Sequence, residues 1–250
     1  MQVEKPKTSK DRIVLALDVD TIEEVEYLVK ELKDYVGFFK VGLQLYSSCG
    51  YKAVEMIKKQ GAKVFFDGKF HDIPNTVAKT SVNLLRNGVD FFNVHIQGGS
   101  KMLSVTVKLT REYAKKNNLD LPTIFGVTLL SSFGQRTLTE ELSVQLNIDD
   151  YVSNLTQIAI ESGINGIVAS AIESKKIREQ AGDDFLIMCP AVRPTWSVVN
   201  DQVRVVTPTD AIRCGIDYLI IGRPIISAEN KVVACNMIID EIEDAIKVEY

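Results

Sequence analysis

The chain has 250 residues, of which 46% are hydrophobic and 25% are charged, and its formal net charge is −4. This composition is that of a globular protein with a sizeable core, and it excludes a disordered or low-complexity chain. The negative balance also excludes a global basic field of the kind that attracts nucleic acid or an anionic membrane surface.

The cysteine pattern and the first residues bear on the cellular compartment. Four cysteines, at positions 49, 189, 214 and 235, are widely spaced and form no C-x-x-C pair. This spacing indicates reduced thiols rather than a disulfide framework or a zinc site. Residues 1–10 form a polar, lysine-rich tail without the apolar stretch of a signal peptide. No apolar run approaches the ~18 residues of a membrane-spanning helix, so we expect a cytoplasmic protein.

Short apolar runs alternate with amphipathic helical patterns along the chain. The eight predicted strands are Ile13–Val19, Phe38–Leu43, Ala62–Lys69, Phe91–Ile96, Thr123–Leu130, Gly166–Ser170, Leu186–Pro190 and Tyr218–Gly222. The predicted helices are Ile22–Asp34, Tyr51–Gln60, Val77–Asn87, Lys101–Lys116, Tyr151–Ser162, Glu173–Ala181, Thr209–Cys214 and Ile225–Lys247. Apolar strands separated by helices are typical of a parallel sheet covered on both faces. Eight such units predict a single α/β domain over residues 11–250, a (β/α)8 TIM barrel rather than a doubly wound sheet.

Local signals support these boundaries. Asp20 and Thr21 can cap the helix that begins at Ile22. Gly61 and Gly163 each follow a predicted helix, where glycine commonly ends the helix. Residues 131–147 form a long insertion after the fifth strand, and we expect it to be partly helical.

Three charged residues follow the apolar run of the third predicted strand, namely Asp67, Lys69 and Asp72. Asp67 and Lys69 are two residues apart, so their side chains point to the same side of a strand. Burying a carboxylate and an ammonium there is costly unless they are paired. The pattern indicates either a functional site or a structural ion pair that caps the strand, and these three residues alone do not decide between the two.

In a (β/α)8 barrel the functional groups lie at the C-terminal ends of the strands. Polar residues occupy most of these positions, namely Asp18, Lys40, Asp67, Lys69, His95, Ser131, Arg193 and Arg223. The loops after strands seven and eight often bind phosphate in such barrels, and Arg193 and Arg223 lie in them. Arginine matches phosphate with a bidentate fork, and Gly222 allows a close approach of the backbone. We therefore predict a phosphate site there.

The segment from Asp67 to Thr76 reads D-x-K-x-x-D-I-P-N-T, and with it the sequence resembles the orotidine 5′-phosphate decarboxylase family. The resemblance runs over essentially the whole chain from Arg12 onward. It includes Leu15-Ala16-Leu17-Asp18, Lys40-Val41-Gly42, Asn93-Val94-His95, Asp201-Gln202-Val203-Arg204, Thr207-Pro208 and Ile221-Gly222-Arg223-Pro224. Related phosphosugar enzymes share the D-x-K-x-x-D core, whereas the added I-P-N-T and K-V-G make the resemblance specific.

The resemblance implies a catalytic role for Lys69, Asp67, Lys40 and Asp72, and substrate binding by Asp18. Lys69 would donate a proton to C6 of the pyrimidine, and Asp67 would lie beside the departing carboxylate. Lys40 and Asp18 would hold the ribose hydroxyls and complete an alternating chain of lysines and aspartates. Asp72 would reach the active site of the second subunit of a homodimer.

The resemblance also implies how the substrate is held. Ile73 and Thr76 would reach across the dimer beside Asp72, and Ser131 would contact the pyrimidine. Gln202 would bridge the base and the phosphate. The phosphate would be bound by Arg193, Gly222 and Arg223.

The implied reaction is the decarboxylation of orotidine 5′-monophosphate to uridine 5′-monophosphate (UMP) and CO2, the last step of de novo pyrimidine biosynthesis. It would need neither a cofactor nor a metal, because the fixed ammonium of Lys69 stabilises the developing carbanion and then supplies the proton. The sequence departs from the family pattern at Ala191, which often is glycine, at Gly68, which commonly is larger, and at Ser131, which many bacterial members replace by threonine. We expect Ala191 to alter the geometry of the lid, the loop over Arg193–Gln202, and Gly68 to loosen its strand.

Three other interpretations remain open at this stage. Metal-dependent relatives, the 3-keto-gulonate-phosphate decarboxylases and hexulose-phosphate synthases, share the D-x-K-x-x-D core but are expected to carry an acidic residue where Lys40 stands. A phosphate-binding barrel without catalysis would serve as a sensor. A purely structural ion-pair cluster does not explain Arg193, Gln202 and Arg223 together.

The histidines and two of the cysteines receive structural interpretations. We expect His71 in a loop or interface and His95 as a hydrogen-bonded wall of the barrel mouth. Cys189 and Cys214 are predicted to be buried apolar fillers.

Overall fold

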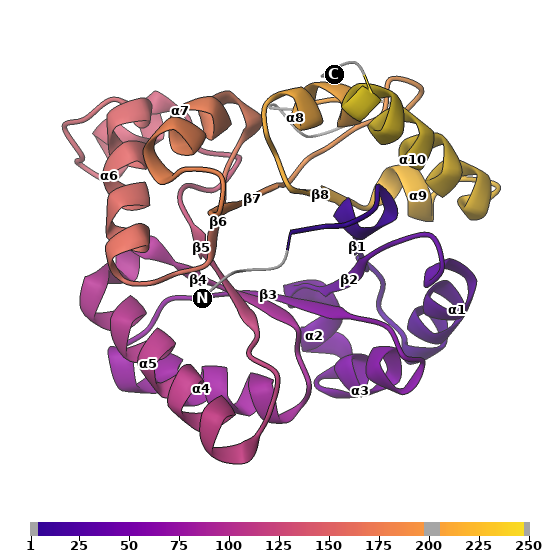
Figure 1. The fold of residues 1–250 in the computed structure, drawn as a ribbon, viewed down its shortest axis with the longest axis horizontal. Helices are drawn as coiled ribbons and strands as arrows, with labels where there is room; N and C mark the ends of the chain where they lie inside the picture. Colours follow the sequence, from indigo (N-terminus) through magenta and orange to yellow (C-terminus); the bar gives the residue numbers. More distant parts are fainter. Residues whose placement is uncertain (1–4, 198–205, 248–250) are drawn as a thin grey trace.

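The computed structural model describes residues 5–197 and 206–247. Eight parallel strands close into a barrel in sequence order, and the helices form a ring outside them (Figure 1). This is the (β/α)8 TIM barrel that the alternation of apolar runs and helical patterns predicts. Gln202, to which the sequence assigns a substrate contact, lies outside the described residues.

The strands are β1 Ile13–Ala16, β2 Phe38–Val41, β3 Val64–Phe70, β4 Phe91–His95, β5 Thr123–Val127, β6 Gly166–Val168, β7 Leu186–Cys189 and β8 Tyr218–Ile221. The α-helices are α1 Ile22–Leu32, α2 Leu43–Cys49, α3 Lys52–Lys59, α4 Pro74–Arg86, α5 Gly99–Asn117, α6 Ile148–Glu161, α7 Ala171–Ala181, α8 Pro208–Arg213, α9 Arg223–Ile226 and α10 Lys231–Lys247. Short turns of other helix types occur at Lys10–Arg12, Ile96–Gly98 and Thr137–Glu141. The last of these confirms that the insertion after β5 is partly helical.

The predicted boundaries differ from the observed ones in two ways. The predicted strands, β3 excepted, extend one to three residues too far at their C-terminal ends, because those residues leave the sheet and enter the loops. The sequence also misses α2, which is only seven residues long, and merges α9 with α10. By contrast, the capping signal is confirmed, since the Thr21 side chain accepts from the Glu24 N–H and Glu24 caps the Thr21 backbone in return.

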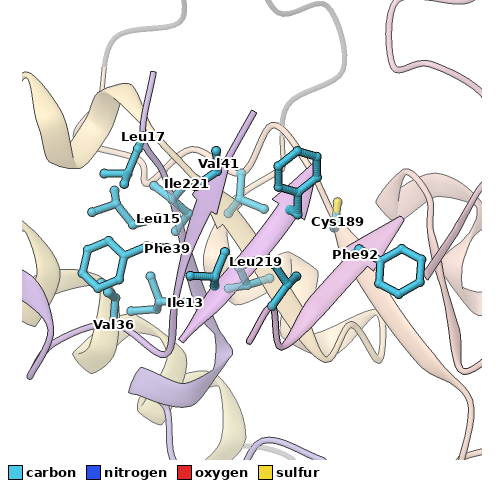
Figure 2. Close-up of a cluster of buried hydrophobic side chains, with 14 of the residues drawn as sticks. Ile13, Leu15, Leu17, Val36, Phe39, Val41, Phe92, Cys189, Leu219 and Ile221 are labelled. Atoms are coloured by element: carbon cyan, nitrogen blue, oxygen red, sulfur yellow. The ribbon is translucent and has the colours of Figure 1, made fainter. Parts of the chain in front are cut away.

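The two-residue period of the strands divides the apolar side chains into two layers. Outward-facing residues pack under the helices, as Figure 2 shows for Ile13 and Leu15 of β1 and for Leu219 and Ile221 of β8. Inward-facing residues fill the half of the barrel where the strands begin, and aromatic rings dominate that layer. The rings of Phe38 and Phe91 stack with their centroids 3.9 Å apart.

This aromatic floor determines what lies above it. Lys40 follows Phe38 by two residues, Asp67 follows Phe65, and Asn93 follows Phe91, so each polar side chain points into the barrel one layer higher. These three side chains are almost fully buried. The fold therefore assembles a polar layer directly on a hydrophobic one, toward the C-terminal ends of the strands.

Gly68 fits the aromatic packing outside β3. A Cβ atom at this position would lie 2.7 Å from Phe70 Cζ and 2.8 Å from Phe66 Cε1. The planes of the two rings are nearly parallel and the rings stack with their centroids 5.8 Å apart. Phe66 also contacts the Tyr46 ring edge-on. The strand continues through Gly68 to Phe70, so the rings occupy the space that a larger residue would fill.

We predict that Gly68→Ala lowers the free energy of unfolding by about 1 kcal/mol, because the clash with two packed rings outweighs the gain in backbone rigidity. Urea unfolding followed by circular dichroism measures the difference. Gly134→Ala is the matched control, since nothing lies within 4 Å of a Cβ added there, and its effect is expected to stay within about 0.5 kcal/mol. Equal stability of Gly68→Ala and the unchanged protein would contradict the prediction.

Candidate active site

Four charged side chains alternate in sign across the ends of β1, β2 and β3. Lys40 Nζ lies 3.6 Å from Asp18 Oδ1 and 3.3 Å from Asp67 Oδ2. Lys69 Nζ lies 2.6 Å from Asp67 Oδ1. The row Asp18, Lys40, Asp67, Lys69 is thus continuous, and the structure brings together the charged residues that the sequence predicts for one subunit.

Asp67 is the most deeply buried carboxylate of this row. Burial alone would raise the pKa of Asp67, but the charges of Lys40 and Lys69 and two hydrogen bonds outweigh it and hold that pKa below its usual value. Asp67 therefore stays ionised at neutral pH.

Two glycines leave room for the row. A Cβ atom at Gly42 would lie 2.8 Å from Lys40 Nζ. A Cβ atom at Gly222 would lie 3.3 Å from Ala16 Cβ and 3.5 Å from Asp18 Oδ2. The backbone at the end of β8 thus passes close to Asp18.

Asn93 is a member of this cluster that the sequence analysis did not select. It is 1% exposed and points into the barrel from β4. Its side chain accepts from the Lys69 N–H at 2.8 Å and donates to Asp67 Oδ1 at 2.8 Å. The inward period from Phe91 through Asn93 to His95 could have identified it, but strand four was interpreted only through the residue at its end.

His95 differs from the expectation of a hydrogen-bonded wall. Its Nδ1 atom is buried and has no hydrogen-bond partner. Burial, together with the charges of His71 and Lys69, lowers the pKa of His95 to about 4. The ring is therefore neutral at pH 7, and it borders the charged row without carrying charge. His71 lies in the loop after β3, as expected, with its ring centroid 5.7 Å from that of His95.

Asp72, Ile73 and Thr76 lie on the surface at the start of α4, outside the cluster. The Asp72 carboxylate accepts from the Ile73 N–H at 2.6 Å. Within the described part of the chain, Asp72 forms no ion pair with Lys69. Ile73 is 67% exposed, which is unusual for a large apolar side chain beside a charged cluster. A single subunit therefore does not bring these three residues to its own row.

Arg193 and Arg223 follow β7 and β8, on the same end of the barrel as the row. Arg193 is 6% exposed, and its N–H donates to the carbonyl of Val206 at 2.8 Å. Val192 and Val206 form a parallel bridge, which closes the base of the loop between them. Arg223 begins α9 directly after Gly222.

Ser131 lies apart from the charged row in the described structure. It lines a mostly apolar cavity of about 240 Å³ together with Ser170, Cys189, Pro190 and others. Burial raises the pKa of the Cys189 thiol to about 12, so this cysteine is a buried filler as predicted. Cys214 also lines the cavity but is only half-buried, which corrects the prediction that it is a buried filler.

A larger cavity, of about 800 Å³, opens at the opposite end of the barrel, where the strands begin. Two lysines of its lining are engaged in ion pairs, with Lys58 2.8 Å from Asp90 and Lys5 3.7 Å from Asp217. Groups at the N-terminal end of a (β/α)8 barrel serve stability, whereas chemistry takes place at the other end. The charged row is therefore the candidate active site, although its four residues line neither of these two cavities.

Within residues 5–197 and 206–247, no three His, Cys, Asp or Glu side chains gather as a set of metal ligands. None of the described helices has the length and apolar character needed to cross a bilayer.

The low pKa of His95 predicts an acid-sensitive stability. The unfolded chain binds a proton at this ring below pH 6.5, whereas the folded chain does so only below about pH 4. The free energy of unfolding should therefore fall as the pH drops through that window, by about 1–2 kcal/mol once the partial exposure of the ring is allowed for. The share of Asp67 is lost only at lower pH, because its pKa is below the usual value.

Denaturant unfolding at a series of pH values compares the unchanged protein with His95→Asn. The variant is expected to show a shallower loss of stability between pH 6.5 and 4 and the same dependence above pH 7. An identical slope in the two proteins would refute the assignment of this transition to His95.

The family is shown by comparison with known proteins. Residues 11–238 match the model of the Orotidine 5'-phosphate decarboxylase / HUMPS family. A protein of Moorella thermoacetica named orotidine 5'-phosphate decarboxylase is 44% identical over 94% of this chain and 93% of its own length. A protein of the same name from Geobacter metallireducens is 43% identical over 94% of this chain and 97% of its own length.

The fold leads to the same group. The crystal structure of orotidine 5'-phosphate decarboxylase from Lactobacillus acidophilus superposes with a TM-score of 0.82 at 31% identity, covering 96% of this chain and 99% of the other. The chain therefore belongs to the orotidine 5'-phosphate decarboxylase / HUMPS family, and its relatives place it among the decarboxylating enzymes of that family.

Proposed function

We propose that this enzyme converts orotidine 5′-monophosphate to UMP and CO2, the last step of de novo UMP synthesis, without a metal or cofactor and with Lys69 protonating C6. The observation that carries the proposal is the alternating row Asp18, Lys40, Asp67, Lys69, with Lys69 Nζ 2.6 Å from Asp67 Oδ1. It sets an ammonium beside a buried, ionised carboxylate at the C-terminal end of the barrel.

The chemistry follows from where charge develops. When the bond between C6 and the carboxylate breaks, its electron pair stays on C6 and CO2 leaves. An ammonium already held in place stabilises that pair without reorganising, and it then transfers its proton to C6. The ionised Asp67 holds the Lys69 ammonium in place until the transfer, and Lys69 regains its proton from solvent afterwards.

The position of Lys40 supports a metal-free reaction over the metal-dependent chemistry of related barrels. Its ammonium lies between the carboxylates of Asp18 and Asp67, 3.6 Å and 3.3 Å away. A divalent cation would need those oxygens as ligands. A cation that is part of the protein already neutralises them, so these two carboxylates present a poor site for Mg²⁺.

Phosphate recognition belongs to the loops after β7 and β8. Arg193 at the closed base of its loop, Arg223 at the start of α9 and the backbone of Gly222 would hold the phosphate, with Gln202 linking it to the base and Ser131 contacting the pyrimidine. Binding energy from a phosphate remote from C6 can drive closure of the loop and exclude water from the reacting bond.

We further propose a cytoplasmic homodimer in which Asp72, Ile73 and Thr76 complete the partner's site. Ile73 and Leu43 are 67% and 63% exposed at the starts of α4 and α2, beside the ends of the neighbouring strands β3 and β2. Exposed apolar side chains that flank a charged mouth indicate a surface meant to be covered. The unpaired side of the Asp72 carboxylate would then face the Lys69 of the second subunit.

The reaction itself is tested by the loss of orotidine 5′-monophosphate absorbance in the presence of EDTA. We expect rapid conversion that survives EDTA and falls on the order of 10⁴-fold or more in Lys69→Ala, because both charge stabilisation and the proton are lost. Lys108→Ala, which changes an exposed lysine of α5, is the control. No conversion by the unchanged protein, or activity on a phosphosugar only when Mg²⁺ is added, would refute the proposal.

The shared site is tested by mixing two inactive variants, Lys69→Ala and Asp72→Ala. If each site takes Lys69 from one subunit and Asp72 from the other, a mixed dimer contains one intact site and one doubly altered site. Random reassociation after co-refolding should restore about a quarter of the original activity. Absence of recovery, with mixed dimers present by mass, would show that Asp72 acts within its own subunit.

A further inference from the structure

The sheet is irregular at the site. Phe66 of β3 pairs with Phe92 of β4, and the next pairing joins Phe70 to Val94. β3 thus advances by four residues while β4 advances by two, which leaves two extra residues on β3 in a bulge. Asp67 and Lys69 both lie in this bulge, so the usual backbone ladder does not hold them.

The bulge places Lys69 in an unfavourable backbone conformation. Its φ angle is +47°, in the left-handed region that non-glycine residues rarely adopt. Such a conformation persists only where the surroundings impose it. The direction in which the Lys69 side chain leaves the strand therefore depends on whatever holds its backbone.

Asn93 is the group that holds it. Its Oδ1 accepts the Lys69 N–H at 2.8 Å, and its Nδ2 donates to Asp67 Oδ1 at 2.8 Å. The orientation of the amide is fixed, because a flipped amide would point its NH2 group at an N–H. The same Asp67 oxygen also receives Lys69 Nζ at 2.6 Å, while the other oxygen faces Lys40.

We propose that Asn93 is a positioning residue for the reaction, whose single amide replaces the missing ladder bond at Lys69 and turns Asp67 toward the Lys69 ammonium. For its chemistry this inference rests on the proposed decarboxylation. Asn93 lies between Phe91 and His95 among the residues of β4 that point into the barrel. Its amide therefore links the position of β4 to two charged residues of β3.

Two substitutions distinguish the hydrogen bond that the Asn93 amide accepts from the one that it donates. Asn93→Ala removes the acceptor and the donor, whereas Asn93→Asp retains an acceptor for the Lys69 N–H and loses the donor to Asp67. For Asn93→Ala we expect kcat to fall by about 10²-fold, the usual effect of a misplaced catalytic group, with a much smaller change in KM. Thr110→Val, which removes a buried hydrogen bond to Ser81 between α5 and α4, is the control for a purely structural loss and should retain kcat.

The pH profile of Asn93→Asp gives a readout that a structural role would not move. At neutral pH the introduced carboxylate repels Asp67, but once protonated it can donate to Asp67 as the amide does. Its kcat, relative to the unchanged enzyme, should therefore rise as the pH is lowered. A constant ratio across the pH range would overturn the inference, as would a change in KM alone for Asn93→Ala. Since the aspartate variant is nearly isosteric, it carries this test if the alanine variant does not fold.

A crystal structure of Asn93→Ala, or of Asn93→Asp at neutral pH, tests the inference without substrate. We expect Lys69 to leave the left-handed region and its Nζ to move away from Asp67 Oδ1. Unchanged geometry would overturn the positioning role even in an active enzyme. A displaced Lys69 in a protein whose unchanged form does not convert orotidine 5′-monophosphate would instead overturn the proposed function and keep the role of Asn93 in holding the ion pair.

Discussion

The structure depends on one carboxylate, Asp67, that is buried inside the barrel between two lysines. Taking this charge out of water is costly, and its attraction to Lys40 and Lys69 offsets the cost only while both stay close. The aromatic floor of Phe38 and Phe91 beneath the row keeps water out and strengthens that attraction. Removing either lysine would leave the buried Asp67 charge with only the other lysine and Asn93 as partners, which destabilises the folded protein. The register of β2 against β3 is therefore determined by charge as well as by hydrophobic packing.

The opposite end of the barrel shows how stability is separated from the site. Side chains that precede three even-numbered strands accept an N–H from the first or second residue of the strand before them: Asp90 from Val64, Asn165 from Ile124, and Asp217 from Ile187. Arg178 adds a bond to Asp217 at 2.8 Å and four more to backbone carbonyls. These bonds satisfy groups that the start of a strand leaves unpaired. Because they tie the strands at one end, the loops and strained residues at the other end can be arranged for binding and chemistry.

The parts of the structure that the sequence predicts are those that depend on periodicity. Alternation of apolar runs and helical patterns predicts the closed barrel, and the rule that strand ends carry function predicts the row from Asp18 to Lys69. The extent of the bulge in β3 could not be predicted, because it arises from the pairing of β3 with β4, but Gly68, which is expected to loosen its strand, is a local signal within it. The unpartnered Nδ1 of His95 likewise depends on packing from several strands. The inward direction of Asn93 is predictable from its two-residue spacing from Phe91, but the rule that function lies at strand ends does not select it.

Backbone strain is concentrated at the two places that the proposed reaction uses most. Among the described residues, four that are not glycine have positive φ, and two of these, Lys69 at +47° and Ala191 at +63°, border the site. Each costs roughly 1–2 kcal/mol relative to an ordinary conformation. Lys69 is held by Asn93, and Ala191 is held by its burial and by the bridge that follows at Val192. Glycine, often present at this position in the family, would adopt the same conformation without strain but would leave the loop freer. Alanine accepts the strain and fixes the direction in which the chain reaches Arg193, so the proposed proton donor Lys69 and the proposed phosphate ligand Arg193 are both oriented by backbone that the rest of the barrel constrains.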